Sequence, residues 1–254
     1  MAIYATDFAV EHKSDNSPVS VADRDAEAEI LARLAASLPD IPVVAEEAVA
    51  EGRTPWIGER FFLVDPLDGT KEFINRNGEF TVNIGLIEDG APTMGVVLAP
   101  ALGLAYAGSP TGAWAGRIAD GAGHVEGWRT IRCRQAGSSP VAVASRSHSN
   151  KATEDALARA QAGDRRSIGS SLKFCLLAEA EADFYPRLGP TMEWDTAAGD
   201  AVLRAAGGRV VTLDGAPLTY GKIGVPGMRK FENPYFLAAG DPKLLERLDL
   251  TQAA

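Results

Sequence analysis

The sequence predicts an α+β protein built from layers of sheet and helix, and three observations support this prediction. Short apolar runs between residues 81 and 107 are separated by turns at Asp89-Gly90 and at Pro100, which is typical of antiparallel hairpins. Segments with helical spacing of apolar residues lie on both sides of these runs. No glycine-rich dinucleotide or phosphate-binding loop follows an apolar run. A layered α+β sandwich is therefore favoured over a doubly wound parallel sheet.

The first half of the chain is predicted to contain one long helix and a series of strands. The helix covers residues 21–38, with Ile30, Leu31 and Leu34 on one face, and Ser20 and Asp23 resemble a capping box at its start. Expected strands or short apolar runs cover residues 41–45, 61–64, 81–87, 94–98, 103–107 and 129–134. A turn is expected over residues 65–70, directly after the second of these runs.

The second half of the chain is predicted to alternate strands and helices, unlike the run of strands in the first half. Residues 136–140 have a linker-like composition, which divides the chain into halves over residues 1–140 and 141–254 within one compact unit. Strands are expected at residues 141–145, 209–213 and 235–239. Helices are expected at residues 151–162, 172–182, 196–206 and 244–248, the third ending at Gly207-Gly208.

Composition and charge exclude several classes of protein. The net charge of −9 disfavours a nucleic-acid-binding module, which needs a basic surface. No apolar run is long enough to span a membrane and no signal peptide is evident, so no transmembrane segment is expected. The two cysteines favour a reducing cytoplasm over a disulfide framework. With three histidines and many carboxylates, the sequence favours a hard cation such as Mg²⁺ over zinc.

The segment Asp65-Pro66-Leu67-Asp68-Gly69-Thr70 is the most informative. Pro66 removes a backbone donor and Gly69 permits a tight turn, so both aspartates can point at one place. The Leu67 carbonyl can face the same place, and carboxylate and carbonyl oxygens are the ligands that magnesium prefers. A plain surface turn is the alternative interpretation, because Asp, Pro and Gly are common in turns.

Three further acidic positions lie at the ends of expected elements. Glu46-Glu47 follows an apolar run, and Asp195 and Asp23 stand near helix starts. Taken singly, the glutamates could be solvated charges and the aspartates could be helix caps. As a set, they lie where loops converge and sites form.

Together these residues resemble the motif set of the lithium-sensitive, magnesium-dependent phosphatases. That group includes inositol monophosphatases, fructose-1,6-bisphosphatases and bisphosphate nucleotidases. The motifs stand in the family's order: Asp23, Glu46-Glu47, Asp65 to Thr70, and Trp194-Asp-Thr-Ala-Ala198. The resemblance implies an αβαβα sandwich with two or three Mg²⁺ ions per site.

Other segments resemble the CysQ type of 3'(2'),5'-bisphosphate nucleotidase. They are residues 13–19, 71–74, 77–83, 145–148, 169–175 and 185–187, and the resemblance runs from about Ala2 to the end of the chain. It implies hydrolysis of 3'-phosphoadenosine 5'-phosphate to AMP and phosphate, and a place in sulfur assimilation. In one departure, the residues before Lys13 are too few for the further N-terminal helix of about four turns that is usual in the family.

The resemblance also implies roles for individual residues. The metal would be bound mainly by the first half, through Glu46, Asp65, the Leu67 carbonyl and Asp68, and the second half would add Asp195. The catalytic residues would be Asp23, Thr70 and Glu46. The second half would contribute most of the substrate contacts, which are Gly69, Thr70, His148, Gly169, Ser170, Ser171, Lys173, Arg187 and Asp195. Taken alone, Lys173 could be a solvated helix charge, and Gly169-Ser170-Ser171 an ordinary loop before a helix. Cys175 lies within an apolar run and is expected in the core.

Two other functions stay open. Inositol monophosphatase or fructose-1,6-bisphosphatase activity would use the same acidic cluster, and the Gly169–Lys173 segment with Arg187 favours a nucleotide instead. A non-catalytic nucleotide-binding protein would not need both Asp23 and Thr70. We further expect a homodimer, with peripheral association with the inner membrane as an alternative to a purely cytoplasmic location.

Overall fold

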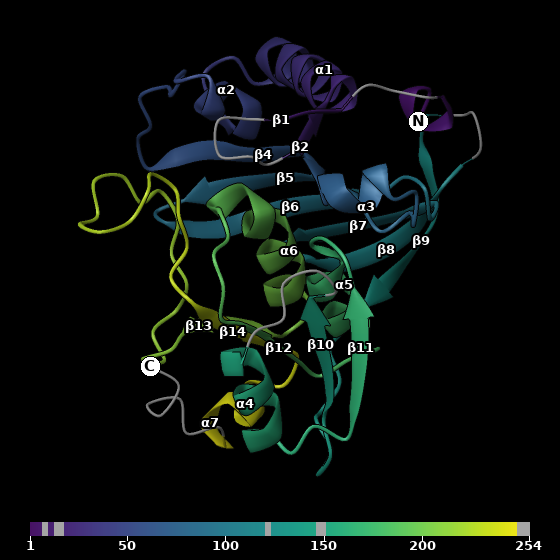
Figure 1. Cartoon of the computed structure of the whole chain (residues 1–254), viewed down its shortest axis with the longest axis vertical. Coiled ribbons are helices and arrows are strands. Elements are labelled where there is room, and N and C mark those ends of the chain that lie inside the picture. Colours follow the sequence, from purple (N-terminus) through teal and green to yellow (C-terminus); the bar gives the residue numbers. More distant parts are fainter. Residues whose placement is uncertain (7–9, 13–17, 120–122, 146–150, 248–254) are drawn as a thin grey trace.

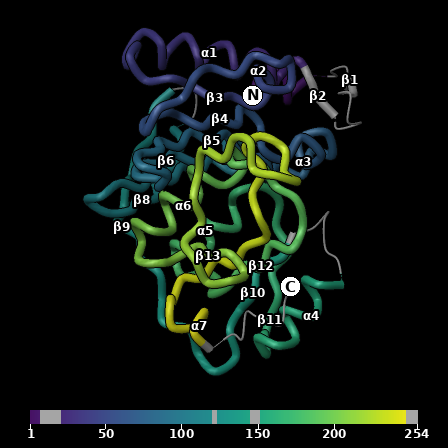
Figure 2. The backbone as a smooth tube through the Cα atoms, turned by 90° about the vertical axis from the view of Figure 1, so that its left-hand side faces the viewer, coloured from purple at the N-terminus to yellow at the C-terminus, as the bar shows by residue number. Residues whose placement is uncertain are grey.

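The computed structural model describes residues 1–6, 10–12, 18–119, 123–145 and 151–247. These residues form two stacked sheets with helices above, between and below them (Figure 1). The view at right angles shows the same succession, from α1 and α2 through α5 and α6 to α4 and α7 (Figure 2). The predicted layered α+β sandwich is confirmed. No helix among the described residues is long and apolar enough to cross a membrane.

The larger sheet is mainly antiparallel, as the sequence predicts. Its strands lie in chain order, and among them only β3 and β4 pair in parallel. They are β3 (Val43–Ala45), β4 (Arg60–Asp68), β5 (Thr81–Glu88), β6 (Ala91–Ala99), β7 (Leu104–Ser109), β8 (Gly112–Ile118) and β9 (Val125–Ile131). Strand β8 was not predicted, because its glycines, alanines and arginine break up the apolar signal. The predicted turn over residues 65–70 is wrong in part, since β4 continues through Asp68.

The smaller sheet is mixed. Its order is β11-β10-β12-β14-β13, with β10 parallel to both neighbours and the other pairs antiparallel. The strands are β10 (Val141–Ser145), β11 (Asp164–Ile168), β12 (Phe184–Arg187), β13 (Arg209–Thr212) and β14 (Phe236–Ala239). Strands β11 and β12 were not predicted, because β11 is an exposed, charged edge strand and β12 is short and contains Pro186. The expected boundary near residues 136–140 falls between β9 and β10, although the division of roles between the halves stays a prediction.

The helices are α1 (Val21–Ser37), α2 (Glu46–Ala50), α3 (Thr70–Ile74), α4 (Lys151–Arg159), α5 (Leu172–Ala178), α6 (Glu193–Ala205) and α7 (Pro242–Arg247). A short 3₁₀ turn (Ile3–Ala5) and the strand pair β1 (Val10–His12) and β2 (Pro18–Ser20) precede them. Helix α6 begins at Glu193, earlier than predicted, because Asp195 accepts a hydrogen bond from the Met192 amide at 2.9 Å and caps the helix. Helix α5 ends at Ala178, earlier than predicted, and Cys175 is fully buried in it as expected.

Helix α6 packs very closely on the larger sheet, and this contact fixes the start of the helix beside the end of β4. Glycines on three neighbouring strands face the helix. A Cβ atom at Gly95 would lie 2.4 Å from the Ala198 carbonyl oxygen, and one at Gly108 would lie 2.6 Å from the Val202 Cα atom. The close approach therefore requires residues without side chains at these positions.

Gly95→Ala is expected to lower the free energy of unfolding by about 1–3 kcal/mol, because the added methyl group forces the helix away from the sheet. Gly137→Ala is the matched control, since a Cβ atom there meets nothing within 4 Å. Urea denaturation of both variants measures the difference. Equal stability of the two variants would show that the helix–sheet contact is looser than described.

Candidate active site

A cavity of about 280 Å³ lies between the two sheets, where the end of β4 faces the starts of α5 and α6. It brings together most of the site residues predicted from the sequence. Its lining includes Glu46, Asp65, Leu67, Asp68, Gly69, Thr70, Gly169, Ser170, Ser171, Lys173, Arg187 and Asp195. Asp23 lies behind Thr70 and is not among the lining residues. His148 lies outside the described residues.

The local backbone at the end of β4 directs several groups into this cavity. The pairing register with β5 shifts between Asp65 and Asp68, so the strand bulges there. One carboxylate oxygen of Asp65 accepts the Leu67 amide at 2.9 Å, which stabilises the bulge. Gly69 then adopts a left-handed conformation with φ of 93°, and α3 begins at Thr70. The sequence thus makes a bulged strand end and a short helix, where a simple turn was expected.

Five carboxylate residues line the cavity, and four of them, Glu46, Asp65, Asp68 and Asp195, form the predicted cluster; the fifth is Glu72. Burial raises the pKa of Asp65 well above its usual value, and the charges of the other three cluster members raise it further. Burial, with the charges of Asp68 and Glu46, raises the pKa of Asp195 to about 8. The four groups therefore lie close enough to repel one another, and such crowding is relieved by a cation.

The donor chemistry of this cluster suits a hard cation. Carboxylate and backbone carbonyl oxygens are the ligands of Mg²⁺ and similar ions. Within the described part of the chain, no three Asp, Glu, His or Cys side chains meet closely enough to form a preformed metal site. Two observations therefore support cation binding here: the ligand atoms are of the type that hard cations prefer, and the carboxylates repel one another in the absence of a cation.

Asp68 joins the two sides of the cavity. Its carboxylate accepts the Ser171 amide at 2.5 Å, and also bonds from Thr81 and Asn83 at 3.3 Å each. The Ser171 hydroxyl in turn donates to the Asn83 side-chain oxygen at 2.7 Å. Thr81 and Asn83 were not identified as site residues, although both lie in the segment 77–83 that carries the resemblance, because a polar residue in a strand does not by itself indicate which partner it will meet.

Asp23 and Thr70 form a second pair at the edge of the cavity. Asp23 is buried on the first turn of α1, and its carboxylate accepts the Thr70 hydroxyl at 3.4 Å. The same hydroxyl lies 3.4 Å from the Leu67 carbonyl oxygen. This places a hydroxyl backed by a carboxylate next to the acidic cluster, which is an arrangement suited to orienting and deprotonating a water.

Lys173 supplies positive charge on the opposite wall. It is only 5% exposed, so it is not the solvated helix charge considered as an alternative. Its Nζ atom donates to the Ser170 carbonyl at 2.6 Å and lies 5.5 Å from the centre of the Tyr185 ring. Burial lowers the pKa of Lys173 to about 8, while the nearby Asp68 charge opposes that shift. An anion bound beside it would favour the charged form.

Arg187 contributes a second cation to this wall. One terminal nitrogen donates to the Pro190 carbonyl at 2.6 Å. The Nε atom is buried and has no hydrogen-bond partner among the described residues. A buried donor without a partner is costly, so this atom points to an acceptor supplied by a ligand.

The backbone amides of the loop before α5 are already partly engaged. Glu79 accepts the Gly169 amide at 2.8 Å, and Asp68 accepts that of Ser171. The predicted anion site at these amides therefore competes with two carboxylates. Glu79 and Glu72 were not identified from the sequence, although both lie in segments that carry the resemblance.

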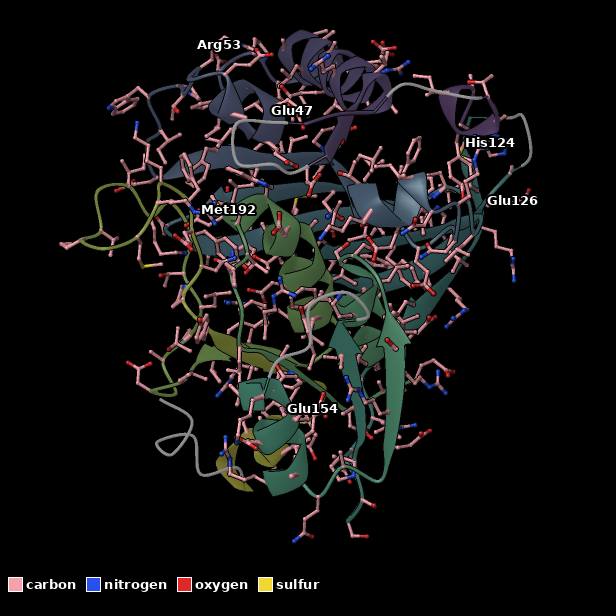
Figure 3. All side chains as sticks on the ribbon, in the orientation of Figure 1. Glu47, Arg53, His124, Glu126, Glu154 and Met192 are labelled. Carbon is pink, nitrogen blue, oxygen red and sulfur yellow. The ribbon has the colours of Figure 1, made fainter. Side chains whose placement is uncertain are left out.

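Asn233 fixes the loop that leads into α6. Its side-chain nitrogen donates to the Met192 carbonyl at 2.8 Å and to the Thr196 hydroxyl at 3.0 Å. Figure 3 labels Met192, which lies where this loop meets the helix. These bonds hold the turn that carries Asp195. Asn233 is far from the motifs in the chain, and no sequence signal identified it.

Comparison with known proteins identifies relatives of this chain. The model of the inositol monophosphatase family matches residues 1–239. A protein from Escherichia coli strain K12, named 3'(2'),5'-bisphosphate nucleotidase CysQ, is 47% identical over 83% of this chain and 82% of its own length. The protein of the same name from Salmonella typhimurium is 48% identical, over 82% and 81%. The crystal structure of CysQ from Bacteroides thetaiotaomicron superimposes with a TM-score of 0.72 at 41% identity, over 89% of this chain and 86% of that one.

Proposed function

Since this chain belongs to the inositol monophosphatase family, we propose that its cavity is the active site of a metal-dependent 3'(2'),5'-bisphosphate nucleotidase. The substrate we propose is 3'-phosphoadenosine 5'-phosphate, and the products are AMP and phosphate. The observation that carries the proposal is the arrangement of one cavity, which has a carboxylate cluster and the Asp23–Thr70 pair on one side, and the buried Lys173 and half-buried Arg187 on the other. The names of the curated relatives support the choice of substrate.

The metal ligands we propose are Glu46, Asp65, the Leu67 carbonyl, Asp68 and Asp195, with Mg²⁺ as the ion and two or three ions per site. When bound, magnesium supplies positive charge to the phosphate oxygens and makes the attacking water more acidic. Inhibition by lithium is part of the proposal. Without the ion, the four carboxylates repel one another and also repel the phosphate, so turnover requires the cation.

The Asp23–Thr70 pair carries the proton transfer. The Thr70 hydroxyl donates to Asp23, so one of its lone pairs can accept a hydrogen bond from water and aim that water at phosphorus. As the water oxygen bonds to phosphorus, a proton passes through the Thr70 hydroxyl to Asp23. The bond from phosphorus to the 3'-oxygen breaks, that oxygen takes up a proton from solvent water as it leaves, and Asp23 then returns its proton to solvent. No covalent intermediate with the protein forms.

The opposite wall selects the nucleotide. Lys173 and the unpaired Nε donor of Arg187 are suited to the 5'-phosphate, because an ionised acceptor makes the strongest bonds to such donors. Gly169, Ser170 and Ser171 line the same side of the cavity, and His148 is proposed to add a further hydrogen bond. Inositol phosphates and fructose bisphosphate are less favoured, because neither presents a nucleotide 5'-phosphate to this wall. Binding without catalysis would leave the Asp23–Thr70 pair without a role.

A comparison of two nucleotides tests this assignment. Adenosine 3'-monophosphate carries the scissile phosphate but lacks the 5'-phosphate, so the wild type is expected to prefer the bisphosphate in kcat/KM. In Lys173→Gln that preference falls by about 10-fold or more, because one charge-assisted hydrogen bond is lost. Lys151→Gln is the control, since Lys151 is exposed on α4. An unchanged preference in Lys173→Gln would place the 5'-phosphate elsewhere.

We also propose a cytoplasmic location and assembly into a homodimer. The two cysteines are free, which supports a cytoplasmic enzyme, and the homodimer stays a prediction.

A further inference from the structure

Helix α1 turns two carboxylates inward. Within this helix, which is described over its whole length, the buried residues are Asp23 and Glu27. They are four residues apart and therefore lie on one face, about 6 Å apart along the axis. Asp23 meets Thr70, as described above. Glu27 points to a different element, and the mechanism so far gives it no part.

Glu27 holds the start of helix α2. One of its carboxylate oxygens accepts the Glu47 amide at 2.8 Å, and the other accepts the Ala48 amide at 2.9 Å. The residue that precedes α2 is Ala45, whose side chain makes no capping bond. The first amides of a helix have no partner within the helix. Glu27 therefore supplies from α1 the cap that the sequence of α2 lacks.

The contact acts on Glu46 through the backbone. The Glu47 amide belongs to the same peptide plane as the Glu46 carbonyl, and a peptide group is rigid. Fixing that amide restricts the backbone rotation of Glu46 and so the direction of its side chain. Figure 3 labels Glu47 in this region, and Glu46 lines the cavity.

From this geometry we propose that Glu27 is a positioning residue, which sets the Glu46 carboxylate in the acidic cluster and so determines how tightly the site binds its cation. The inference rests on the proposed function, in which Glu46 is a metal ligand. Because Asp23 and Glu27 share one helix, the water-activating pair and this ligand are fixed relative to each other by a single rigid element.

A purely structural cap would have a different signature. It would lower the stability of the protein without altering the affinity of the folded form for a cation. The distinguishing measurement is therefore direct binding of Mn²⁺ to the folded, metal-free protein by titration calorimetry, without substrate. The Mg²⁺ concentration that gives half-maximal activity provides a second reading.

The experiment compares the wild type with Glu27→Ala, Glu27→Gln and a control. The control is Glu29→Ala, on the same helix but 63% exposed and paired with Arg33. Groups that orient a metal ligand change affinity by about 10–100-fold, so Glu27→Ala is expected to weaken Mn²⁺ binding to that extent. The Mg²⁺ requirement should rise in parallel, with kcat largely recovered at saturating Mg²⁺. Glu27→Gln keeps one acceptor oxygen and should fall between the wild type and Glu27→Ala.

The outcomes separate the two levels of the proposal. If the wild type binds no Mn²⁺, the proposed function itself fails. If the wild type binds Mn²⁺ and folded Glu27→Ala binds it equally well, the positioning role is overturned while the proposed function stands. If Glu27→Ala does not fold, Glu27→Gln decides by the same titration, and wild-type affinity in that variant overturns the role.

Discussion

Asp68→Asn is expected to remove nearly all phosphate release, with a loss of about 10³-fold or more in kcat, while the protein stays folded. Removal of one preorganised group that stabilises the transition state costs about 10²–10³-fold, and Asp68 also interacts with the rest of the carboxylate cluster. The substitution keeps the shape of the side chain and one acceptor oxygen for the Ser171 amide. It removes only the charge that a cation requires.

The same change should preserve or raise the stability of the metal-free protein. Burial raises the pKa of Asp68, so ionisation of this group in the folded state is unfavourable and costs stability increasingly as pH rises above the pKa of the unfolded chain. An asparagine avoids that cost at neutral pH. Thermal melts followed by circular dichroism measure it, beside the assay for phosphate release. Asp89→Asn, in the turn between β5 and β6, is the control; wild-type turnover in folded Asp68→Asn would refute the metal assignment.

The second large effect is expected at the water-activating pair. Asp23→Asn and Thr70→Ala should each lower kcat by about 10²–10⁴-fold, the range for a positioned acid–base group. Because the two side chains act through one hydrogen bond, the double variant should be little slower than the slower single variant. Thr70→Ser keeps the hydroxyl and should recover much of the activity.

Cation binding distinguishes this pair from the metal ligands. Neither side chain is a proposed ligand, so the affinity for Mn²⁺ should stay within about threefold of the wild type, which is under 1 kcal/mol. Asp25→Asn, exposed on the same helix, controls for charge. A double variant whose losses multiply would show that Asp23 and Thr70 act independently, contrary to the relay described here.

Much of the fold was predictable because its signals are local. The hairpins of the larger sheet follow from apolar runs and turn residues, and α1 from helical spacing. What was missed lacks such signals: β8 is rich in glycine and alanine, and β11 is a charged edge strand. The bulge at Asp65 and the early start of α6 depend on side-chain bonds to the backbone, which alter an element without changing its pattern.

The candidate site was likewise predictable only in part. The acidic residues were predicted because they form motifs in a known order. Their supports were not, since Asn83, Glu27 and Asn233 reach the site only through tertiary contacts. For a polar residue in a strand, on a helix face or in a loop, no sequence feature indicates which residue its side chain will contact. The buried state of Lys173 likewise depends on packing between the two sheets.

We propose that this cavity hydrolyses a bisphosphate nucleotide with the help of Mg²⁺. The most direct test measures phosphate release by the wild type from 3'-phosphoadenosine 5'-phosphate and from inositol 1-phosphate, with Mg²⁺, in the presence and absence of Li⁺. We expect a strong preference for the nucleotide, AMP as its product, and inhibition by Li⁺. A preference for inositol 1-phosphate, or release of the 5'-phosphate in place of the 3'-phosphate, would contradict the assignment of Lys173 and Arg187, and no release from either substrate would contradict the claim itself.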